Sequence, residues 1–126
     1  MPALVSVIDD DDSVREALES LIRSVGLLAR VFASAEQFLE SAAVDKTACL
    51  VLDVLMPGMS GIELHRDLLS KGYRIPVIFM TAHASGEDCR AEALSLGGIA
   101  YLIKPFRKSE LLDAIFSALK PNERQG

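Results

Sequence analysis

Polar residues follow four apolar runs of this chain at the points where those runs end. If the runs are parallel strands of one sheet, their carboxyl ends share one edge, and ligands bind outside that edge. The sequence therefore predicts a single polar site built from distant segments. Its members are Asp9 and Asp10 after Ala3–Ile8, Asp53 at the end of 49–53, Thr81 after Ile75–Met80, and Lys104 after Ile99–Ile103.

The residue types at this predicted edge suit phosphoryl chemistry. Two carboxylates about 4 Å apart repel by about 4 kcal/mol at an effective dielectric near 20, so neighbouring aspartates need a proton or a cation. Carboxylate oxygens without His or Cys beside them suit Mg²⁺ or Mn²⁺ better than zinc. Two acids for a metal, a third for nucleophilic attack, the lysine and the threonine hydroxyl together describe phosphoryl transfer to a carboxylate.

The elements that must position these residues follow an alternating βα pattern. A run that is apolar on both faces, such as 49–53, is typical of a strand buried in a parallel sheet, whereas the mixed run Leu28–Phe32 is expected at the sheet edge. Five βα units predict an α/β domain with a parallel sheet and helices on both faces. The expected strands are 3–8, 28–32, 49–53, 75–80 and 99–103, and Val44–Ala48 is expected to be a polar connector.

Three helix starts show the spacing of a capping box, in which Ser is followed three residues later by Glu or Gln. These pairs are Ser13 and Glu16, Ser34 and Gln37, and Ser60 and Glu63, with Asp11 or Asp12 as an alternative N-cap of the first helix. The first three helices are expected to reach about Val25, Ala42 and Lys71. A short fourth helix is expected over Glu87–Leu96, and a fifth is marked by Leu112, Ile115, Phe116 and Leu119.

The bulk composition is that of one compact domain. The chain has 126 residues, half of them hydrophobic, and a formal net charge of −5, which argues against disorder and against direct nucleic-acid binding. No apolar stretch reaches the ~20 residues that span a bilayer, and four aspartates, Asp9–Asp12, follow the first apolar run where a signal peptide would not place them. Cys49 and Cys89 form no disulfide framework, so we expect reduced thiols in a cytoplasmic protein, with Cys49 in the core.

Four motifs, in order along the chain, closely resemble the receiver domain of bacterial two-component response regulators. They are Val7-Ile8-Asp9-Asp10, Leu52-Asp53-Val54-Leu55-Met56-Pro57-Gly58, Met80-Thr81-Ala82 and Tyr101-Leu102-Ile103-Lys104-Pro105-Phe106. The resemblance covers residues 3–120, and the stretches 33–39 and 76–83 are most similar to receivers of the FixJ type. It implies a single doubly wound (βα)5 domain of the flavodoxin-like class, with a five-stranded parallel sheet in the order 2-1-3-4-5.

The resemblance also implies which residues handle the phosphoryl group and the metal. Asp53 would accept a phosphoryl group from a sensor histidine kinase. Asp10 and Asp53 would bind Mg²⁺, or Mn²⁺ in its place, while Asp9 would act largely through water. The backbone carbonyl of Leu55 would complete the protein ligands.

Further roles follow from the same resemblance. Thr81 and Lys104 would hold the phosphoryl oxygens, and the Lys104-Pro105 peptide bond would be cis. Tyr101 would turn inward as Thr81 moves toward the phosphate. The readout would be a population shift of the face formed by the fourth helix, the fifth strand and the fifth helix, through which family members dimerise or bind partners. Such a domain is a phosphoacceptor that supports only its own phosphotransfer and autodephosphorylation, and not an enzyme acting on other substrates.

Five other positions carry specific expectations. Leu55 and His83 each lie two residues after a site residue and would flank the phosphoryl group. Because Leu55 cannot orient water, we expect slow autodephosphorylation, with His83 influencing its rate. Gly98 and Ala100 depart from the alanine and the acid that are frequent in the family, and Gly98 should loosen the entry to the fifth strand. His65 is expected to be a solvated helix residue.

The sequence disfavours two other functions and leaves a third open. A haloacid dehalogenase-type phosphatase needs a second acid at the position of Leu55, and an FMN carrier needs a phosphate loop without four aspartates. A pseudo-receiver that regulates by protein contact without phosphorylation stays open as an alternative. We expect residues 1–120 to form the receiver domain and 121–126 to be a polar tail or the start of a linker. The FixJ-type resemblance suggests a transcription regulator whose DNA-binding domain is missing from this sequence.

Overall fold

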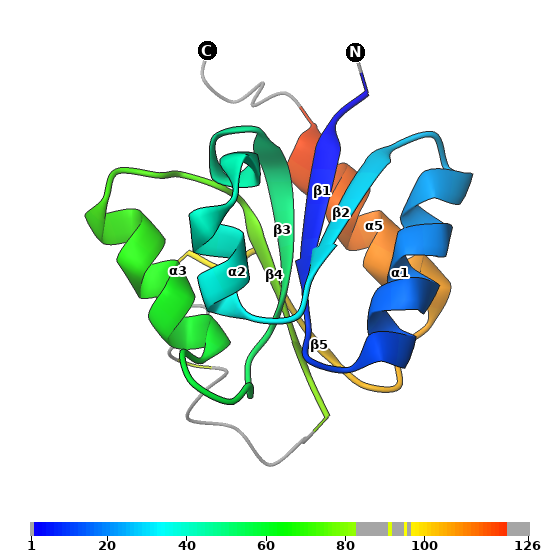
Figure 1. The fold of residues 1–126 in the computed structure, drawn as a ribbon. Helices are drawn as coiled ribbons and strands as arrows, with labels where there is room; N and C mark the ends of the chain where they lie inside the picture. Colours follow the sequence, from blue (N-terminus) through cyan, green and yellow to red (C-terminus); the bar gives the residue numbers. More distant parts are fainter. Residues whose placement is uncertain (1, 83–90, 92–94, 96, 121–126) are drawn as a thin grey trace.

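A computed structural model of the chain describes residues 2–82, 91, 95 and 97–120, and a parallel sheet runs through its middle (Figure 1). The five strands lie in the order β2-β1-β3-β4-β5, and every neighbouring pair is parallel. This confirms the strand order implied by the resemblance and the edge position expected for the second strand. The strands are β1 (Leu4–Ile8), β2 (Leu28–Phe32), β3 (Thr47–Asp53), β4 (Val77–Thr81) and β5 (Ala100–Ile103).

Helices cover both faces of the sheet, as expected for a doubly wound α/β domain (Figure 1). Helices α1 and α5 lie on one face, and α2 and α3 lie on the other. The helical segments are α1 (Asp12–Ser24), α2 (Ala35–Glu40), a short 3₁₀ helix η1 (Ala42–Asp45), α3 (Gly61–Ser70) and α5 (Lys108–Leu119). The fourth helix expected over 87–96 falls mostly outside the described residues.

The central strand, β3, supplies apolar side chains to both faces of the sheet. Along β3, Cys49 and Val51 pack with the α1 and α5 side, while Leu50 and Leu52 pack with the α2 and α3 side. All four are fully buried, and each of the three aliphatic side chains contributes about 2 kcal/mol of hydrophobic stabilisation. The burial of Cys49 confirms it as a small core residue, and it raises the pKa of the thiol to about 12.

The third strand begins two residues earlier than predicted, and the expected polar connector is wrong. Ala43 and Val44 are buried within η1, and β3 starts at Thr47. The hydroxyl of Thr47 lies 2.7 Å from the hydroxyl of Ser6 and donates to the carbonyl of Ala43 at 2.7 Å. Because both buried hydroxyls are hydrogen-bonded, the cost of removing them from water is offset. The strand can therefore begin at the polar residue Thr47.

Other boundaries shift by one or two residues. β4 covers Val77–Thr81 where 75–80 was predicted, because Pro76 has no N–H to donate to the ladder, and Thr81 is thus the last residue of the strand. β5 starts at Ala100, one residue late. In α5 the buried residues are Leu111 and Ile115, whereas Phe116, expected on the apolar face, is 43% exposed.

Side-chain caps begin the first three helices. Asp11, one of the alternatives for α1, is the N-cap and accepts hydrogen bonds from the backbone N–H groups of Ser13 and Val14. Ser34 caps α2, and Ser60 forms a complete capping box with Glu63 at α3. Two of these helices, α1 and α3, are the next elements after the strands whose ends bear the acidic residues, so their caps help to set the loops of the site.

His65 contradicts its prediction as a solvated residue. Its side chain is only 3% exposed, and its ring centroid lies 5.4 Å from that of Phe79 on β4. No described residue hydrogen-bonds its Nδ1. Helical periodicity places position 65 beside Leu64 and Leu68, which are both buried. The prediction was wrong because it followed the polar type of the histidine and not its position in the helix.

Candidate functional site

The carboxyl edge of the sheet brings the predicted polar residues together. Asp53 is the last residue of β3, Asp9 directly follows β1, and Lys104 directly follows β5. The Lys104 backbone N–H donates to the carbonyl of Thr81 at 2.7 Å, which ties the ends of β4 and β5 to each other. The parallel register thus places four strand ends around one site.

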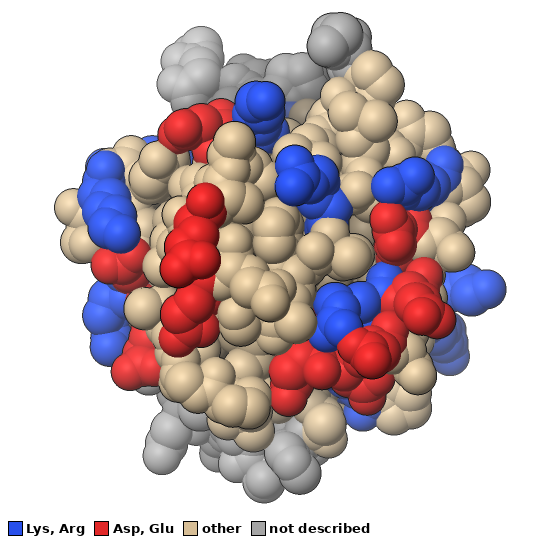
Figure 2. All heavy atoms as spheres, in the orientation of Figure 1, with Lys and Arg blue, Asp and Glu red and all other residues tan. Residues whose placement is uncertain are grey.

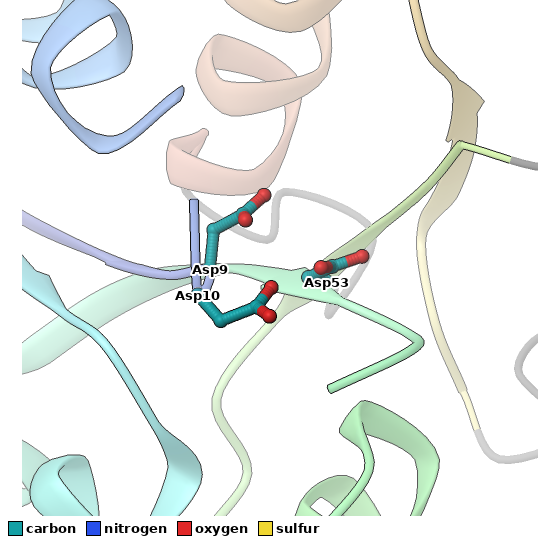
Figure 3. Close-up of side chains that lie close together, drawn as sticks. All are labelled: Asp9, Asp10 and Asp53. Carbon is teal, nitrogen blue, oxygen red and sulfur yellow. The ribbon is translucent and has the colours of Figure 1, made fainter. Parts of the chain in front are cut away.

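Three of these residues form an acidic cluster (Figure 3). One carboxylate oxygen from each of Asp9, Asp10 and Asp53 lies within 4.8 Å of the others. Asp9 is fully buried and Asp53 is 5% exposed, whereas Asp10 is exposed. The cluster opens into a cavity of about 230 Å³ lined by Asp9, Asp10, Asp11, Asp53, Leu55, Ala82 and Lys104.

Lys104 is the cation of the cluster, and it lies closest to Asp9. Its Nζ donates to Oδ2 of Asp9 at 2.7 Å and lies 3.9 Å from Oδ1 of Asp53. The ammonium group therefore forms a hydrogen-bonded ion pair with the fully buried acid and a longer contact with Asp53. A lysine side chain is flexible enough to exchange between such neighbouring acceptors.

The environment of Asp53 makes its ionised form less favourable than that of an aspartate in water. Burial is the main cause, followed by the nearby charge of Asp9, and together they raise the pKa of Asp53 to about 6. Lys104 opposes this increase, Asp10 adds to it, and a hydrogen bond from the backbone N–H of Leu55 opposes it. A divalent cation would favour the carboxylate form by the same electrostatic principle.

The cluster fits a hard divalent cation. It offers carboxylate oxygens only, and the mixture of buried and exposed acids leaves one side open to water or phosphate. Mg²⁺ prefers oxygen ligands and keeps several positions for water or substrate phosphate, so the donor set matches its requirements. Leu55 lines the same cavity and is the neighbouring residue that could add a backbone ligand.

The other predicted site residues lie on the strands and loops around the cluster. Thr81 is buried at the end of β4, beside the fifth strand. Tyr101 lies on β5, where its partly buried ring packs against the core on the α2 and α3 side. The side chain of Leu55 is 53% exposed at the rim. His83 lies outside the described residues.

The Lys104-Pro105 peptide bond is cis, which confirms the resemblance-based prediction. It lies immediately after β5, at the residue that supplies the ammonium group. Gly58, which follows Pro57 in the loop after β3, has a positive φ of 78°, the conformation that glycine adopts in a type II turn after proline. Both turns therefore have the backbone geometry that their sequence motifs indicate.

Three residues that sequence reasoning missed support the site from outside the cavity. Arg15 donates to the backbone carbonyl of Asp9 at 2.7 Å. Glu36 accepts a hydrogen bond of 3.3 Å from the N–H of Met59 and so contacts the loop after β3. A Cβ at Gly61 would lie 2.3 Å from the backbone oxygen of Asp53, so glycine permits the close approach of α3. These contacts join residues that local patterns do not connect.

Comparison with known proteins identifies the class. A family model described as the response regulator receiver domain matches residues 5–116. The response regulator protein TodT of Pseudomonas putida is 42% identical over 124 residues, which cover 97% of this chain and 54% of TodT. The transcriptional regulatory protein FixJ of Azorhizobium caulinodans is 40% identical over 122 residues, covering 97% of this chain and 57% of FixJ. The solved structure of the response regulator StyR superimposes with a TM-score of 0.89 and 43% identity, covering 99% of this chain and 63% of StyR.

The chain therefore belongs to the receiver-domain family of two-component response regulators. The family resemblance predicted from the four motifs, including its FixJ-type character, is confirmed. The chain spans about half the length of the curated relatives it matches. Among the described residues, no helix has the length and apolar character to cross a membrane.

Proposed function

We propose that this chain is a phosphorylation-controlled receiver in which Asp53 accepts a phosphoryl group from a sensor histidine kinase. The observation that carries the proposal is the meeting of Asp9, Asp10 and Asp53 within 4.8 Å, with the Lys104 ammonium 3.9 Å from Asp53. Membership of the receiver family supports the kinase as the donor. The proposed roles of individual residues rest on this geometry and on the family motifs.

In the proposed reaction, a carboxylate oxygen of Asp53 attacks the phosphorus atom of a phosphohistidine. A phosphorus–oxygen bond forms, the phosphorus–nitrogen bond breaks, and the leaving imidazole takes up a proton. Lys104 and the Thr81 hydroxyl would hold the phosphoryl oxygens, which spread the negative charge of the transition state. Because the pKa of Asp53 is about 6, its nucleophilic carboxylate form already predominates at neutral pH.

The proposed cofactor is Mg²⁺, with Mn²⁺ as a substitute. Asp10 and Asp53 would bind it directly, the backbone carbonyl of Leu55 would complete the protein ligands, and Asp9 would act largely through water. When bound, the cation would neutralise charge on the phosphoryl group. Leu55 brings no group that could orient a water molecule, so we propose slow autodephosphorylation, with His83 as a modulator.

We further propose that phosphorylation is read out through Thr81 and Tyr101. The phosphorylated side chain would carry about −1.5 to −2 charges in place of the single charge of the carboxylate, which draws Thr81 toward the site and biases Tyr101 and the face of the fourth helix, β5 and α5. That face would contact partners or a second phosphorylated copy. Residues 1–120 would form the receiver and 121–126, outside the described residues, a tail or linker of a cytoplasmic transcription regulator.

The test is phosphorylation by a small acyl-phosphate donor. Wild type and Asp53→Ala are incubated with acetyl phosphate, with and without Mg²⁺, and the products are weighed as intact proteins. A base-labile adduct of one phosphoryl group is expected on wild type with Mg²⁺ and absent from the variant. An unmodified wild type would overturn the proposal. A wild type that reacts with acetyl phosphate but with no histidine kinase of its source organism would favour the pseudo-receiver instead.

A further inference from the structure

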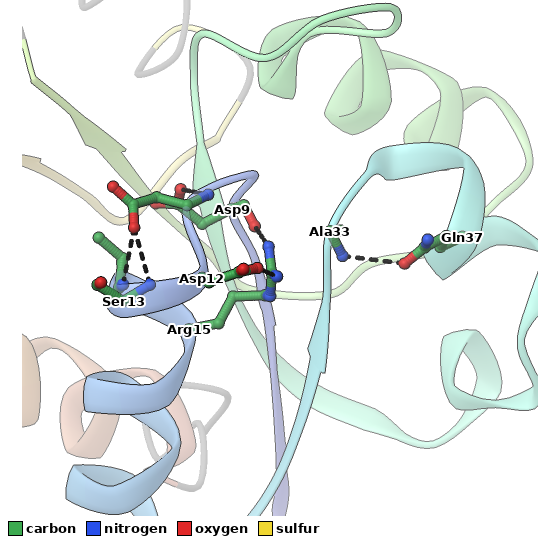
Figure 4. A network of polar contacts seen from close by, with 8 residues as sticks. Asp9, Asp12, Ser13, Arg15, Ala33 and Gln37 are labelled. Atoms are coloured by element: carbon green, nitrogen blue, oxygen red, sulfur yellow. Dashed lines mark hydrogen bonds and ion pairs between the residues drawn. The ribbon is translucent and has the colours of Figure 1, made fainter.

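Asp9 is held by hydrogen bonds at four points, and Figure 4 shows the one from Arg15. Its backbone N–H donates to the carbonyl of Phe32 at 3.1 Å, and its Oδ1 accepts from the N–H of Asp11 at 2.9 Å. Its Oδ2 accepts from Lys104 at 2.7 Å, and its carbonyl accepts from the guanidinium of Arg15 at 2.7 Å. The turn between β1 and α1 is therefore tied to β2, to the end of β5 and to α1.

Arg15 makes the link from α1. Its Nη1 donates to the Asp9 carbonyl, while its Nη2 forms an ion pair with the carboxylate of Asp12. The side chain is only 17% exposed, although it projects from the first turns of a surface helix. Figure 2 shows basic side chains among the acidic ones over the start of this helix. A planar guanidinium can serve two acceptors at once, which an ammonium cannot do with the same geometry.

We propose that Arg15 is a positioning residue for the acidic cluster. By holding the Asp9 carbonyl, it fixes the turn from which the carboxylates of Asp9 and Asp10 face Asp53, and it thereby increases the affinity of the cluster for a divalent cation. This inference rests on the proposed function, since it concerns the same metal. It adds to that function a residue outside the cavity lining.

The charge of Arg15 and its hydrogen bond make opposite contributions. A positive charge beside a cation site weakens cation binding, so its removal alone would increase affinity. Loss of the positioning contact lets the turn move and decreases affinity, as outer-shell substitutions in metal sites do, by about tenfold or more. Arg15→Lys keeps the charge and removes the fork, while Arg15→Ala removes both. The two substitutions therefore separate positioning from electrostatics.

The experiment compares these variants with Arg23→Ala as a matched control. Arg23 lies on the same helix, pairs with Glu19 at 2.9 Å and donates to the carbonyl of Ala29 at 3.4 Å, so its removal breaks contacts of the same kind away from the site. Binding of Mn²⁺ is measured from the electron paramagnetic resonance signal of the free ion. Melting temperature is recorded alongside. Amide hydrogen exchange at Asp11 is followed without metal.

Arg15→Lys is expected to bind Mn²⁺ about tenfold more weakly than wild type, and Arg15→Ala to lose less affinity because its missing charge offsets part of the effect. Both variants are expected to lose protection of the Asp11 amide, whereas Arg23→Ala changes neither property. Unchanged or tighter Mn²⁺ binding by Arg15→Lys would overturn the inference. It would also be overturned if Arg23→Ala lost Mn²⁺ affinity in proportion to a decrease in its melting temperature, because lower stability alone would then explain the weaker binding. If wild type binds no Mn²⁺, the metal proposal itself fails, and with it the effect on affinity. The exchange result then still decides whether Arg15 fixes the turn.

Discussion

At the scale of single residues, Asp53 is subject to opposing electrostatic effects. Burial and the charges of Asp9 and Asp10 raise its pKa, while Lys104 and the N–H of Leu55 lower it. The net pKa of about 6 lies above the ordinary value of 3.8. In the metal-free protein, the group that would react is thus also one that destabilises the fold when it ionises.

This conflict predicts how Asp53→Asn affects stability. Because the pKa of Asp53 is higher in the native than in the unfolded state, its protonation stabilises the fold. This contribution to stability is fully present below about pH 4 and is lost as the pH rises through about 6. Since asparagine stays neutral, the variant should be about 2 kcal/mol more stable than wild type near neutral pH and equal to it in acid. Urea denaturation in the presence of a chelator measures the difference. Equal stabilities at neutral pH would contradict the prediction.

His65 predicts the opposite dependence on pH. Burial lowers the pKa of its imidazole, so the native state holds it neutral while the unfolded chain protonates near 6.5. Its contribution is present above pH 6.5 and decreases as the pH falls below that value. His65→Phe should therefore gain stability relative to wild type on acidification. The free energies of unfolding of the two proteins are compared across this pH range, and the contribution of Asp53 cancels because both proteins contain it. A difference that does not change with pH would argue against the effect.

At the scale of elements, the site depends on how closely α3 approaches the end of β3. The backbone N–H of Gly61, the first residue of α3, donates to the carbonyl of Val54 at 3.0 Å and closes the loop between them. Glu36 holds that loop from α2 through Met59. The strand that carries Asp53 and the helix that follows it are thus packed backbone against backbone, with no space for a side chain.

Gly61→Ala tests this packing. Alanine favours a helix over glycine by about 1 kcal/mol, but the added Cβ would lie 2.3 Å from the Asp53 backbone oxygen and 3.1 Å from Cγ of Leu52. Because backbone must move to relieve this overlap, we expect a net loss of about 2 kcal/mol in the free energy of unfolding. Chemical denaturation measures it. A variant as stable as wild type would show that α3 can shift freely.

At the scale of the whole molecule, stability and cation binding should be coupled. The acids lie at the ends of β3, the central strand, and of its neighbour β1, so a bound cation would link segments 43 residues apart, from Asp10 to Asp53. An ion that binds only the folded state stabilises it by mass action. The repulsion among the three carboxylates is the reason why this coupling should be large.

Mg²⁺ should therefore raise the stability of the whole chain. At about 100 times its dissociation constant, it is expected to add about 2.7 kcal/mol to the free energy of unfolding of wild type. Asp10→Ala should lose most of this gain. Glu40→Ala, which removes an exposed acid from α2, should keep it. Denaturation with Mg²⁺, against NaCl of equal ionic strength, distinguishes the ion from general screening; a gain that persists in Asp10→Ala would locate the binding elsewhere.

The sequence by itself determined the kind of fold and the identity of the strand-end residues. Alternating apolar runs and helical periods are local, so the βα order, the edge position of β2 and the capping box at Ser60 could be predicted from them. The four motifs added the strand order and the cis bond before Pro105. Boundaries such as Thr47 were missed because buried hydroxyl pairs depend on a distant partner, Ser6.

Only the tertiary structure decided distances and partners. Lys104 lies closer to Asp9 than to Asp53, His65 is buried, and Arg15 contacts the Asp9 carbonyl. All three features involve groups brought together by packing. Local sequence patterns determine which face of an element is apolar. They do not determine which of several nearby acceptors a long side chain reaches, because that choice depends on the register of strands far apart in the chain.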